Sequence, residues 1–229
     1  MRGILRFFVP LLFVGAVVGL VAPANAQEWE SSEQWGTWQN GEYTLYNNIW
    51  GSGAGTQTIW ANSFSDWGVI ADHPNTGGVK SYPNASRAID QPISAIGGLA
   101  SEFDITVPED GAYVAAYDIW ANDHAYEIML WMSQYGPVGP IGSQVDTVDV
   151  GGHTWDVYTG SNGSNEVFSF VRQGNTASGE VDILAVLQWI QDQGWYGDAT
   201  IGDVQFGYEI TSSAGGLEFT TNNYAVNVR

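Results

Sequence analysis

Short β-rich runs separated by turn-forming residues dominate the sequence from residue 34 to the C-terminus. Aromatic and β-branched residues concentrate in the runs, whereas Gly, Asn, Ser and Pro cluster between them. Many short strands with glycine-rich turns are typical of an all-β sandwich or barrel, and they argue against alternating strand–helix units. We expect strands at 42–49, 57–60, 101–106, 113–120, 126–133, 154–158, 167–171, 199–208 and 217–228.

One stretch has the period of a helix instead. Its apolar positions are Ile183, Val186, Leu187 and Ile190. These positions follow the spacing i, i+3, i+4, i+7, and Gly179 and Gly194 flank them. The spacing predicts one helix over 179–193, packed on the outside of a sheet. No low-complexity linker or internal repeat divides the chain, so we expect a single domain over residues 27–229.

The first 26 residues have the features of a secretory signal peptide. Arg2 and Arg6 form a positive start, an apolar run covers 7–22, and Ala24-Asn25-Ala26 supplies the small residues of a cleavage site. The apolar run is short for a bilayer span. We therefore expect cleavage before Gln27 and a secreted, extracellular protein.

The charge balance restricts the partners. The whole chain carries 6 basic and 25 acidic residues, and removal of Arg2 and Arg6 with the signal peptide takes the formal net charge from −19 to −21. Such a field repels phosphate backbones and anionic lipids, so nucleic acid and membrane partners are disfavoured. Acidic polysaccharides are disfavoured for the same reason. A neutral substrate is favoured.

The content of cysteine and histidine restricts the chemistry. The chain has no cysteine, which excludes thiol chemistry, zinc–thiolate sites and disulfides. Its three histidines, His73, His124 and His153, lie far apart without the spacing of metal ligands. We expect no cofactor and no catalytic metal; a structural calcium on the acidic residues stays open.

Two glutamates interrupt stretches that otherwise read as buried strands. Side chains alternate across a strand, so Glu127 shares a face with Met129 and Trp131, and Glu209 shares a face with Gln205. A carboxylate among apolar side chains loses hydration, which raises its pKa. Paired acids, one ionised and one protonated, are what hydrolysis of a glycosidic bond requires. The alternative is that both are solvated acids on edge strands.

A third acid is expected beside Glu127. If 113–120 pairs antiparallel with 126–132 through a turn at 122–124, Asp118 comes close to Glu127. Trp120 shares the face of Asp118. A sheet face with acids, tryptophans and a methionine is a poor core but suits a sugar cleft, because the C–H faces of sugar rings stack on indoles.

Six segments together give the chain a resemblance to a known family. They are 43–51 (YTLYNNIWG), 79–82 (VKSY), 116–120 (AYDIW), 126–131 (YEIMLW), 139–142 (GPIG) and 204–209 (VQFGYE). In this order, from Gln34-Trp35 to the C-terminus, they resemble glycoside hydrolase family 12, whose members are small endo-β-1,4-glucanases. The turn between Asp118 and Glu127 is shorter than in fungal members, and the disulfide of some relatives is missing.

The resemblance implies a β-jelly roll of two curved antiparallel sheets with one helix and a concave substrate cleft. It also implies a retaining double displacement in which Glu127 is the nucleophile, Glu209 is the acid/base and Asp118 is a supporting acid. The residues expected to contact substrate are Trp35, Asn48, Trp50, Trp120, Met129, Trp131, Pro140 and Gln205.

The sequence therefore predicts a secreted, monomeric endoglucanase that acts on cellulose or mixed-linkage β-glucan without a metal. Two alternatives remain. The same machinery could be specific for xyloglucan, which depends on loop shape rather than on the acids. A non-catalytic carbohydrate-binding jelly roll would keep the tryptophans, but it would have no need of two desolvated glutamates.

Overall fold

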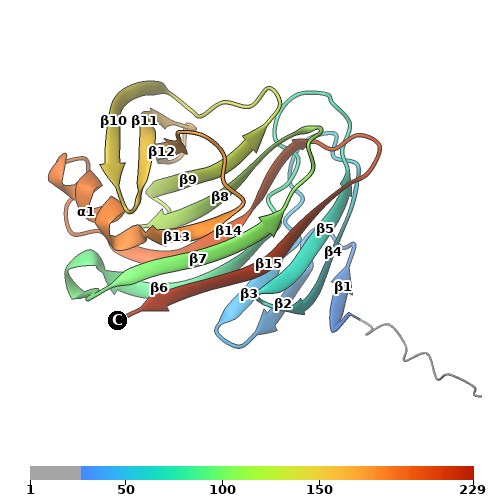
Figure 1. Ribbon diagram of the computed structural model, residues 1–229, viewed down its shortest axis with the longest axis horizontal. Coiled ribbons are helices and arrows are strands. Elements are labelled where there is room, and N and C mark those ends of the chain that lie inside the picture. The colour runs from blue at the N-terminus through green and yellow to red at the C-terminus, as the bar shows by residue number, and fades with distance from the viewer. Residues whose placement is uncertain (1–26) are drawn as a thin grey trace, which may run out of the picture.

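The computed structural model describes residues 27–229, so the expected signal peptide lies outside the described part of the chain. The strands form two curved sheets that stack face to face (Figure 1). The larger sheet has the spatial order β10 (Ser143–Val150), β11 (His153–Ser161), β12 (Glu166–Arg172), β9 (Tyr126–Tyr135), β8 (Ala112–Ala121), β14 (Thr200–Ser212), β6 (Asn84–Pro92), β3 (Tyr43–Tyr46) and β2 (Thr37–Asn40). The smaller sheet has the order β1 (Trp29–Ser31), β4 (Thr56–Ser63), β5 (Asp66–Asp72), β15 (Leu217–Val228), β7 (Leu99–Thr106) and β13 (Ser178–Asp182).

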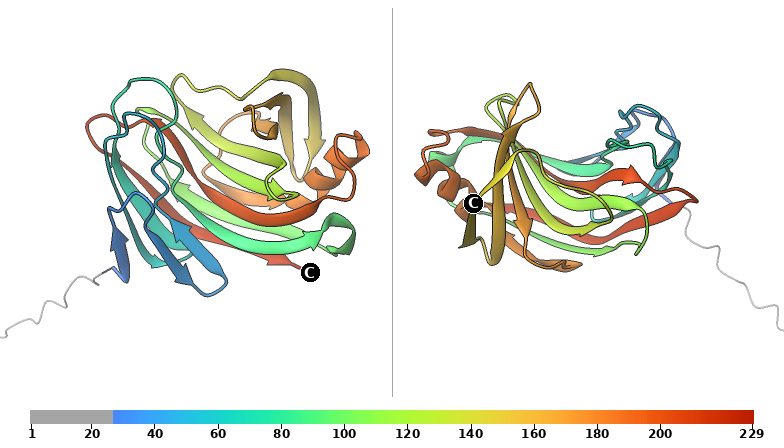
Figure 2. Two further views of the ribbon diagram at one scale, coloured as in Figure 1. Left: turned by 180° about the vertical axis from the view of Figure 1, so that it is seen from behind. Right: turned by 90° about the horizontal axis from the view of Figure 1, so that it is seen from above.

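The apolar core lies between the two sheets, as the alternation of side chains predicts. On β14, Val204, Phe206, Tyr208 and Ile210 are fully buried in this core. Because neighbouring side chains point to opposite faces, Gln205 and Glu209 lie on the free face of the larger sheet. That face is concave, with β10–β12 rising at one end (Figure 2). The expected jelly roll is therefore confirmed, and the concave face is where the acids project.

All of the expected strands are present; β15 has the expected bounds, and the others differ at one or both ends. The first of them stops at Tyr46 rather than residue 49, because Asn48 has a positive φ of 44° that a strand does not accommodate. The sequence did not predict β1, β2, β5, β6, β10 or β13. Strand β10, for example, is largely exposed and lies at the edge of its sheet, so it lacks the apolar alternation on which the prediction depends.

The helix starts later than the prediction. Helix α1 covers Ile183–Asp192, whereas 178–182 forms the edge strand β13 paired with β7. Asp182 caps the helix, because its Oδ1 accepts a hydrogen bond of 3.1 Å from the N–H of Ala185. The predicted apolar face is buried. A 3₁₀ turn, η1 (Ile93–Ala95), is also present. Within 27–229, no helix has the length and apolar character needed to cross a membrane.

One strand pair departs from the expected antiparallel pattern. Strand β12 runs parallel to β9, with Val167 opposite Glu127. The hairpin between β11 and β12 consequently lies at the start of β9, beside Glu127. This arrangement brings residues near 162 into the site described below.

Candidate active site

The concave face carries a cleft of about 470 Å³ that contains all three predicted acids. It is lined by Asn48, Trp50, Val79, Tyr82, Asp118, Trp120, His124, Glu127, Met129, Trp131, Gly139, Ile141, Asn162, Gln205 and Glu209. These residues come from three strands of the larger sheet, β8, β9 and β14, and from the loops at its rim. Residues 48 and 209, which are far apart in the sequence, therefore share one cavity.

The hairpin of β8 and β9 positions two of the acids. Its register places Trp120 opposite Glu127 and Asp118 opposite Met129, as expected from the sequence. Asp118 and Glu127 are therefore diagonal neighbours on one face. The turn between the strands is tight: residues 122–124 have φ values of 50°, 52° and 67°. Asn122 ties this turn to β14, because its Oδ1 accepts from the N–H of Thr200 at 2.8 Å.

Strand β14 positions the third acid. It pairs with β8 on one side and with β6 on the other, so Glu209 projects from the interior of the sheet rather than from an edge. Glu209 is only partly exposed. The alternative of a solvated acid on an edge strand does not describe this residue.

The two glutamates have different ionisation properties. Burial and the nearby charge of Glu127 raise the pKa of Glu209 to about 7. Burial also raises the pKa of Glu127 above its usual value of 4.5, but a hydrogen bond opposes this rise. Nδ2 of Asn162 donates to Oε2 of Glu127 at 3.1 Å. Near pH 6, Glu209 is therefore largely protonated.

Asp118 is almost completely buried, with 6% of its surface exposed. Burial raises its pKa well above the usual range, and the charges of Glu127, Glu209 and Asp203 raise it further. Its Oδ1 has no hydrogen-bond partner within the described residues. A protonated carboxyl group in this place can donate a hydrogen bond to a neighbouring carboxylate or to a ligand.

The Asn48–Trp50 segment forms one wall of the cleft. The N–H of Trp50 donates to the carbonyl of Lys80 at 3.1 Å, and Nδ2 of Asn48 donates to the carbonyl of Tyr82 at 3.2 Å. The indole of Trp50 stays 51% exposed. A partly exposed indole on a cleft wall can stack on a sugar ring.

A buried polar network supports this wall from below. Gln57 donates to the carbonyl and side chain of Asn47 at 2.7 and 2.8 Å, and its Oε1 lies 2.9 Å from Nε2 of His73. Burial lowers the pKa of His73 to about 4. The imidazole therefore stays neutral at ordinary pH and holds the network together by hydrogen bonds.

The predicted contact residues differ in their exposure. Met129 and Trp131 line the cleft but are 5% and 4% exposed, because they form a small apolar cluster that Val138 and Val171 cover. Trp131 consequently cannot offer a broad stacking surface. Trp35 and Pro140 are not among the residues that line the cleft, although the neighbours of Pro140 do line it. Gln34, the neighbour of Trp35, is tied to the cleft wall, because its carbonyl accepts from the N–H of Ile49.

Several cleft residues were missed by the sequence analysis: Val79, Tyr82, His124, Gly139, Ile141 and Asn162. Four of these, Val79, Tyr82, Gly139 and Ile141, lie in segments that resemble the family, which was a usable signal. Asn162 lies in an Asn-Gly turn and had no such signal. It reaches Glu127 only because β12 pairs with β9 in parallel.

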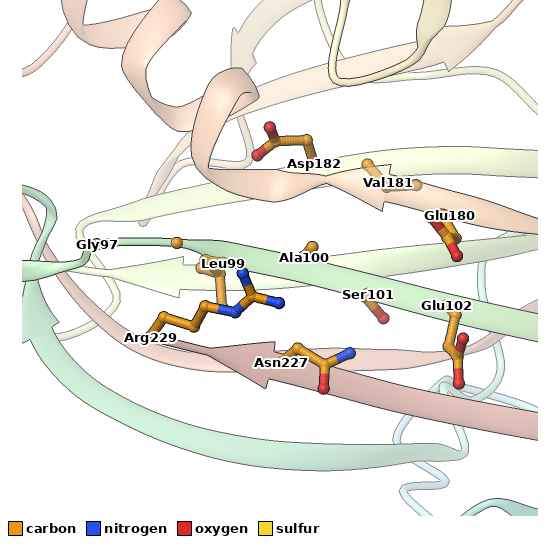
Figure 3. A pocket seen from close by; sticks show the side chains of 11 residues that line it. Gly97, Leu99, Ala100, Ser101, Glu102, Glu180, Val181, Asp182, Asn227 and Arg229 are labelled. Carbon is orange, nitrogen blue, oxygen red and sulfur yellow. The ribbon is translucent and has the colours of Figure 1, made fainter.

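A second hollow lies on the smaller sheet, along β7 between β13 and the end of β15 (Figure 3). It is lined by 97–102, 180–182, Asn227 and Arg229. None of these residues is aromatic, so the hollow has no platform for a sugar ring. The cleft on the concave face, in contrast, combines tryptophans with the three predicted acids.

Comparison with known proteins gives consistent matches. A family model described as Glycosyl hydrolase family 12 matches residues 41–229. The xyloglucan-specific endo-beta-1,4-glucanase A of Emericella nidulans is 33% identical over 216 residues, which cover 85% of this chain and 89% of that protein.

Solved structures agree with this match. The xyloglucanase domain of a type three effector from Sinorhizobium fredii, in complex with cellobiose, is 39% identical with a TM-score of 0.87, covering 89% of this chain and all of that one. A thermostable cellulase derived from a Rhodothermus marinus enzyme is 31% identical with a TM-score of 0.80, covering 88% and 99%.

Proposed function

The chain belongs to glycosyl hydrolase family 12, and we propose that it cleaves internal β-1,4 bonds of glucans by a retaining double displacement at Glu127 and Glu209. It is a glycoside hydrolase of the endoglucanase and xyloglucanase type. The observation that carries the mechanism is that two acids lie in one cleft and that their surroundings favour different ionisation states. Glu209 has a pKa of about 7, whereas Glu127 accepts a hydrogen bond that favours its charged form.

In the first step, the carboxylate of Glu127 attacks the anomeric carbon while the bond to the leaving oxygen breaks. Glu209 donates its proton to that oxygen, so the leaving sugar departs as a neutral alcohol. The product is a glycosyl ester on Glu127. Retaining enzymes hold the two carboxyl groups roughly 5–5.5 Å apart for this purpose.

In the second step, Glu209 acts as a base. The ester has removed the negative charge of Glu127, and this charge is one of the two causes that raise the pKa of Glu209. Glu209 therefore ionises more readily in the intermediate. It takes a proton from water, the water oxygen attacks the anomeric carbon, and the Glu127 carboxylate is released.

Asp118 supports the nucleophile in this proposal. Burial and the charges of Glu127, Glu209 and Asp203 raise the pKa of Asp118, which favours its neutral form beside the two glutamates. A neutral carboxyl group diagonal to Glu127 on the adjacent strand can share its proton with the nucleophile. That sharing would stabilise the charge of Glu127 before attack.

We propose unbranched cellulose chains or mixed-linkage β-glucan as substrate. The cleft combines hydroxyl-binding groups with the exposed face of Trp50, and its carboxyl groups disfavour anionic polymers. Xyloglucan is the second candidate, and the names of the relatives in Emericella nidulans and Sinorhizobium fredii favour it. Secretion with cleavage before Gln27, and action as a monomer, also belong to the proposal.

Parallel hydrolysis of barley β-glucan, hydroxyethylcellulose and xyloglucan tests the activity and ranks the substrates. Early viscosity loss with few new reducing ends indicates internal cleavage. Proton NMR of the first product should show the β-anomer, because two inversions retain configuration. Initial α-product would contradict the double displacement, and inactivity on all three polymers would contradict the proposed function.

The variant Glu127→Gln tests the nucleophile. The amide cannot form the ester, so kcat should fall by roughly 10⁴-fold or more, as it does when catalytic nucleophiles are removed. Glu166→Gln is a matched control, because this exposed glutamate starts the neighbouring strand β12 and its loss changes the net charge equally. Near-native kcat in Glu127→Gln would remove Glu127 from the mechanism.

A further inference from the structure

A polar cluster of Ser86, Asp203 and the predicted contact residue Gln205 lies where two hollows meet. Trp120, His124 and Gln205 line both the acid-containing cleft and a neighbouring hollow of about 680 Å³ over β3, β6, β14 and β8. Asp203 and Ser86 line the neighbouring hollow. The two hollows therefore form one groove across the concave face, and Gln205 lies at their junction.

A β-bulge turns Asp203 toward this groove. The register of β14 shifts between Ile201 and Asp203 against both of its neighbours, β6 and β8. Ile201 is fully buried in the core, whereas Asp203, two residues later, shares the concave face with Gln205. Residues two apart on a regular strand point the same way, so the bulge at Gly202 reverses the alternation. Bulges that redirect a side chain in this way are common beside active sites.

The hydrogen bonds of Asp203 determine the orientation of Gln205. Oδ2 of Asp203 accepts from Oγ of Ser86 at 2.6 Å and from Nε2 of Gln205 at 2.8 Å. A carboxylate only accepts, so the amide of Gln205 must turn its NH₂ group toward Asp203. Within residues 27–229, the Gln205 side chain has no other hydrogen bond to the protein. Its carbonyl oxygen is left free at the junction of the two hollows.

We propose that Asp203 is a positioning residue that fixes the Gln205 amide, so that Oε1 of Gln205 accepts a hydrogen bond from a sugar hydroxyl bound at the junction. This inference rests on the proposed glucan hydrolysis and adds one specific substrate contact to it, the hydrogen bond from a sugar hydroxyl to Oε1 of Gln205. Without Asp203, the amide rotates freely and presents either its NH₂ or its carbonyl group to the substrate. A bound hydroxyl then loses its fixed acceptor, and transition-state binding weakens.

A double-mutant cycle tests whether Asp203 acts through Gln205. The variants are Asp203→Ala, Gln205→Ala and the double variant, measured as kcat/KM on the glucan that the wild-type enzyme hydrolyses best. Each single variant should lose roughly 3- to 10-fold, the range of one hydrogen bond. The double variant should lose no more than Gln205→Ala alone, because both changes remove the same contact. Additive losses would overturn the proposal.

An exchange of the two polar groups gives a readout that a merely structural role would not produce. Gln205→Glu alone places two carboxylates together and should lose activity. Asp203→Asn combined with Gln205→Glu restores a donor at 203 and an acceptor oxygen at 205, and it keeps the net charge of the wild type. This pair should recover most of kcat/KM, and absence of recovery would contradict the proposal.

A matched control exists on the opposite sheet. Oδ1 of Asp104 accepts from Nδ2 of Asn222 at 2.8 Å, so Asp104→Ala breaks the same kind of bond away from the cleft and should leave kcat/KM unchanged. Thermal melting of each variant checks the fold. Wild-type inactivity on every glucan would overturn the proposed function itself, whereas an active wild type with an additive cycle would overturn only the role of Asp203.

Discussion

The two glutamates of the cleft differ because their neighbours differ. Glu127 accepts a hydrogen bond from Asn162, which favours its charged form, whereas the causes acting on Glu209 are burial and the charge of Glu127, and both favour its neutral form. Chemically identical side chains therefore become suited to opposite roles. A pH dependence of activity follows directly from this difference.

The profile of kcat/KM against pH should be bell-shaped, with its basic limb near pH 7. Glu209 must be protonated to donate, so activity is present below its pKa of about 7 and is lost as pH rises through that value. Glu127 must be ionised, so activity also falls as pH drops through its raised pKa. Carboxyl ¹³C NMR on Glu127→Gln should show a lower pKa for Glu209, because the neighbouring charge is gone. An unchanged Glu209 titration would contradict this coupling.

Asn162 should set the acidic limb of the same profile. Its hydrogen bond to Glu127 lowers the pKa of that carboxyl group. In Asn162→Ala the acidic limb of kcat/KM should move to higher pH, by up to about one unit for the loss of a hydrogen bond to a charged group. Asn175→Ala, which removes a hydrogen bond to the backbone of Gln134 instead, is the control. An unmoved acidic limb would show that Asn162 does not influence the nucleophile.

The residue scale also shows what sequence can and cannot provide. Glu127 and Glu209 were found because each interrupts a stretch typical of a buried strand, and Asp118 because a short hairpin would place it beside Glu127; both signals are local. Asn162 and Asp203 were not found. The first depends on a parallel pairing between distant strands. Asp203 shares the face of Gln205 by simple alternation, but its network depends on the pairing of β14 with β6, which brings Ser86 to it. Neither feature has a local signature.

At the element scale, Gly207 allows β6 to approach the strand that carries Glu209. A Cβ atom at this position would lie 2.1 Å from the carbonyl oxygen of Pro83 and 2.7 Å from Cβ of Asn84. The carbonyl of Pro83 accepts from the N–H of Tyr208, so it cannot move away freely. The glycine is therefore a packing requirement of the sheet beneath the cleft.

Gly207→Ala should accordingly lower the free energy of unfolding by about 2–3 kcal/mol, the typical effect of overpacking. Urea denaturation followed by tryptophan fluorescence measures this change. Gly197→Ala is the matched control, because a Cβ atom there meets nothing within 4 Å and the residue has no positive φ. Equal stability of the two variants would mean that β6 and β14 can separate without penalty.

Edge strands and element boundaries are the parts of the fold that the sequence did not predict. The nine expected strands and the helix exist because alternation and the 3.6-residue period are carried by buried apolar residues. Strands β2 and β10 lie at sheet edges and contain no buried residue, so buried apolar side chains do not mark them in the sequence. The start of α1 was wrong because residues 178–182 pair with β7, a contact that a helical pattern cannot reveal.

At the scale of the whole molecule, negative charge is the dominant feature. Residues 27–229 contain four basic residues, the 6 of the full chain less Arg2 and Arg6, against 25 acids. The groove itself adds to this field, since Glu42, Asp90, Asp123 and Asp203 line the hollow beside the catalytic cleft. An anionic polymer that enters the groove therefore meets repulsion both at a distance and on contact.

Salt should consequently separate charged from neutral substrates. The Debye length falls from about 10 Å at 0.1 M to about 3 Å at 1 M salt, so added NaCl screens the repulsion between the protein and carboxymethylcellulose. For this substrate kcat/KM should rise several-fold over that range. Hydroxyethylcellulose has the same backbone with neutral substituents, and its kcat/KM should change little. If both substrates respond equally, the salt acts on the enzyme rather than on the encounter, and the charge of the groove does not select against anionic glucans.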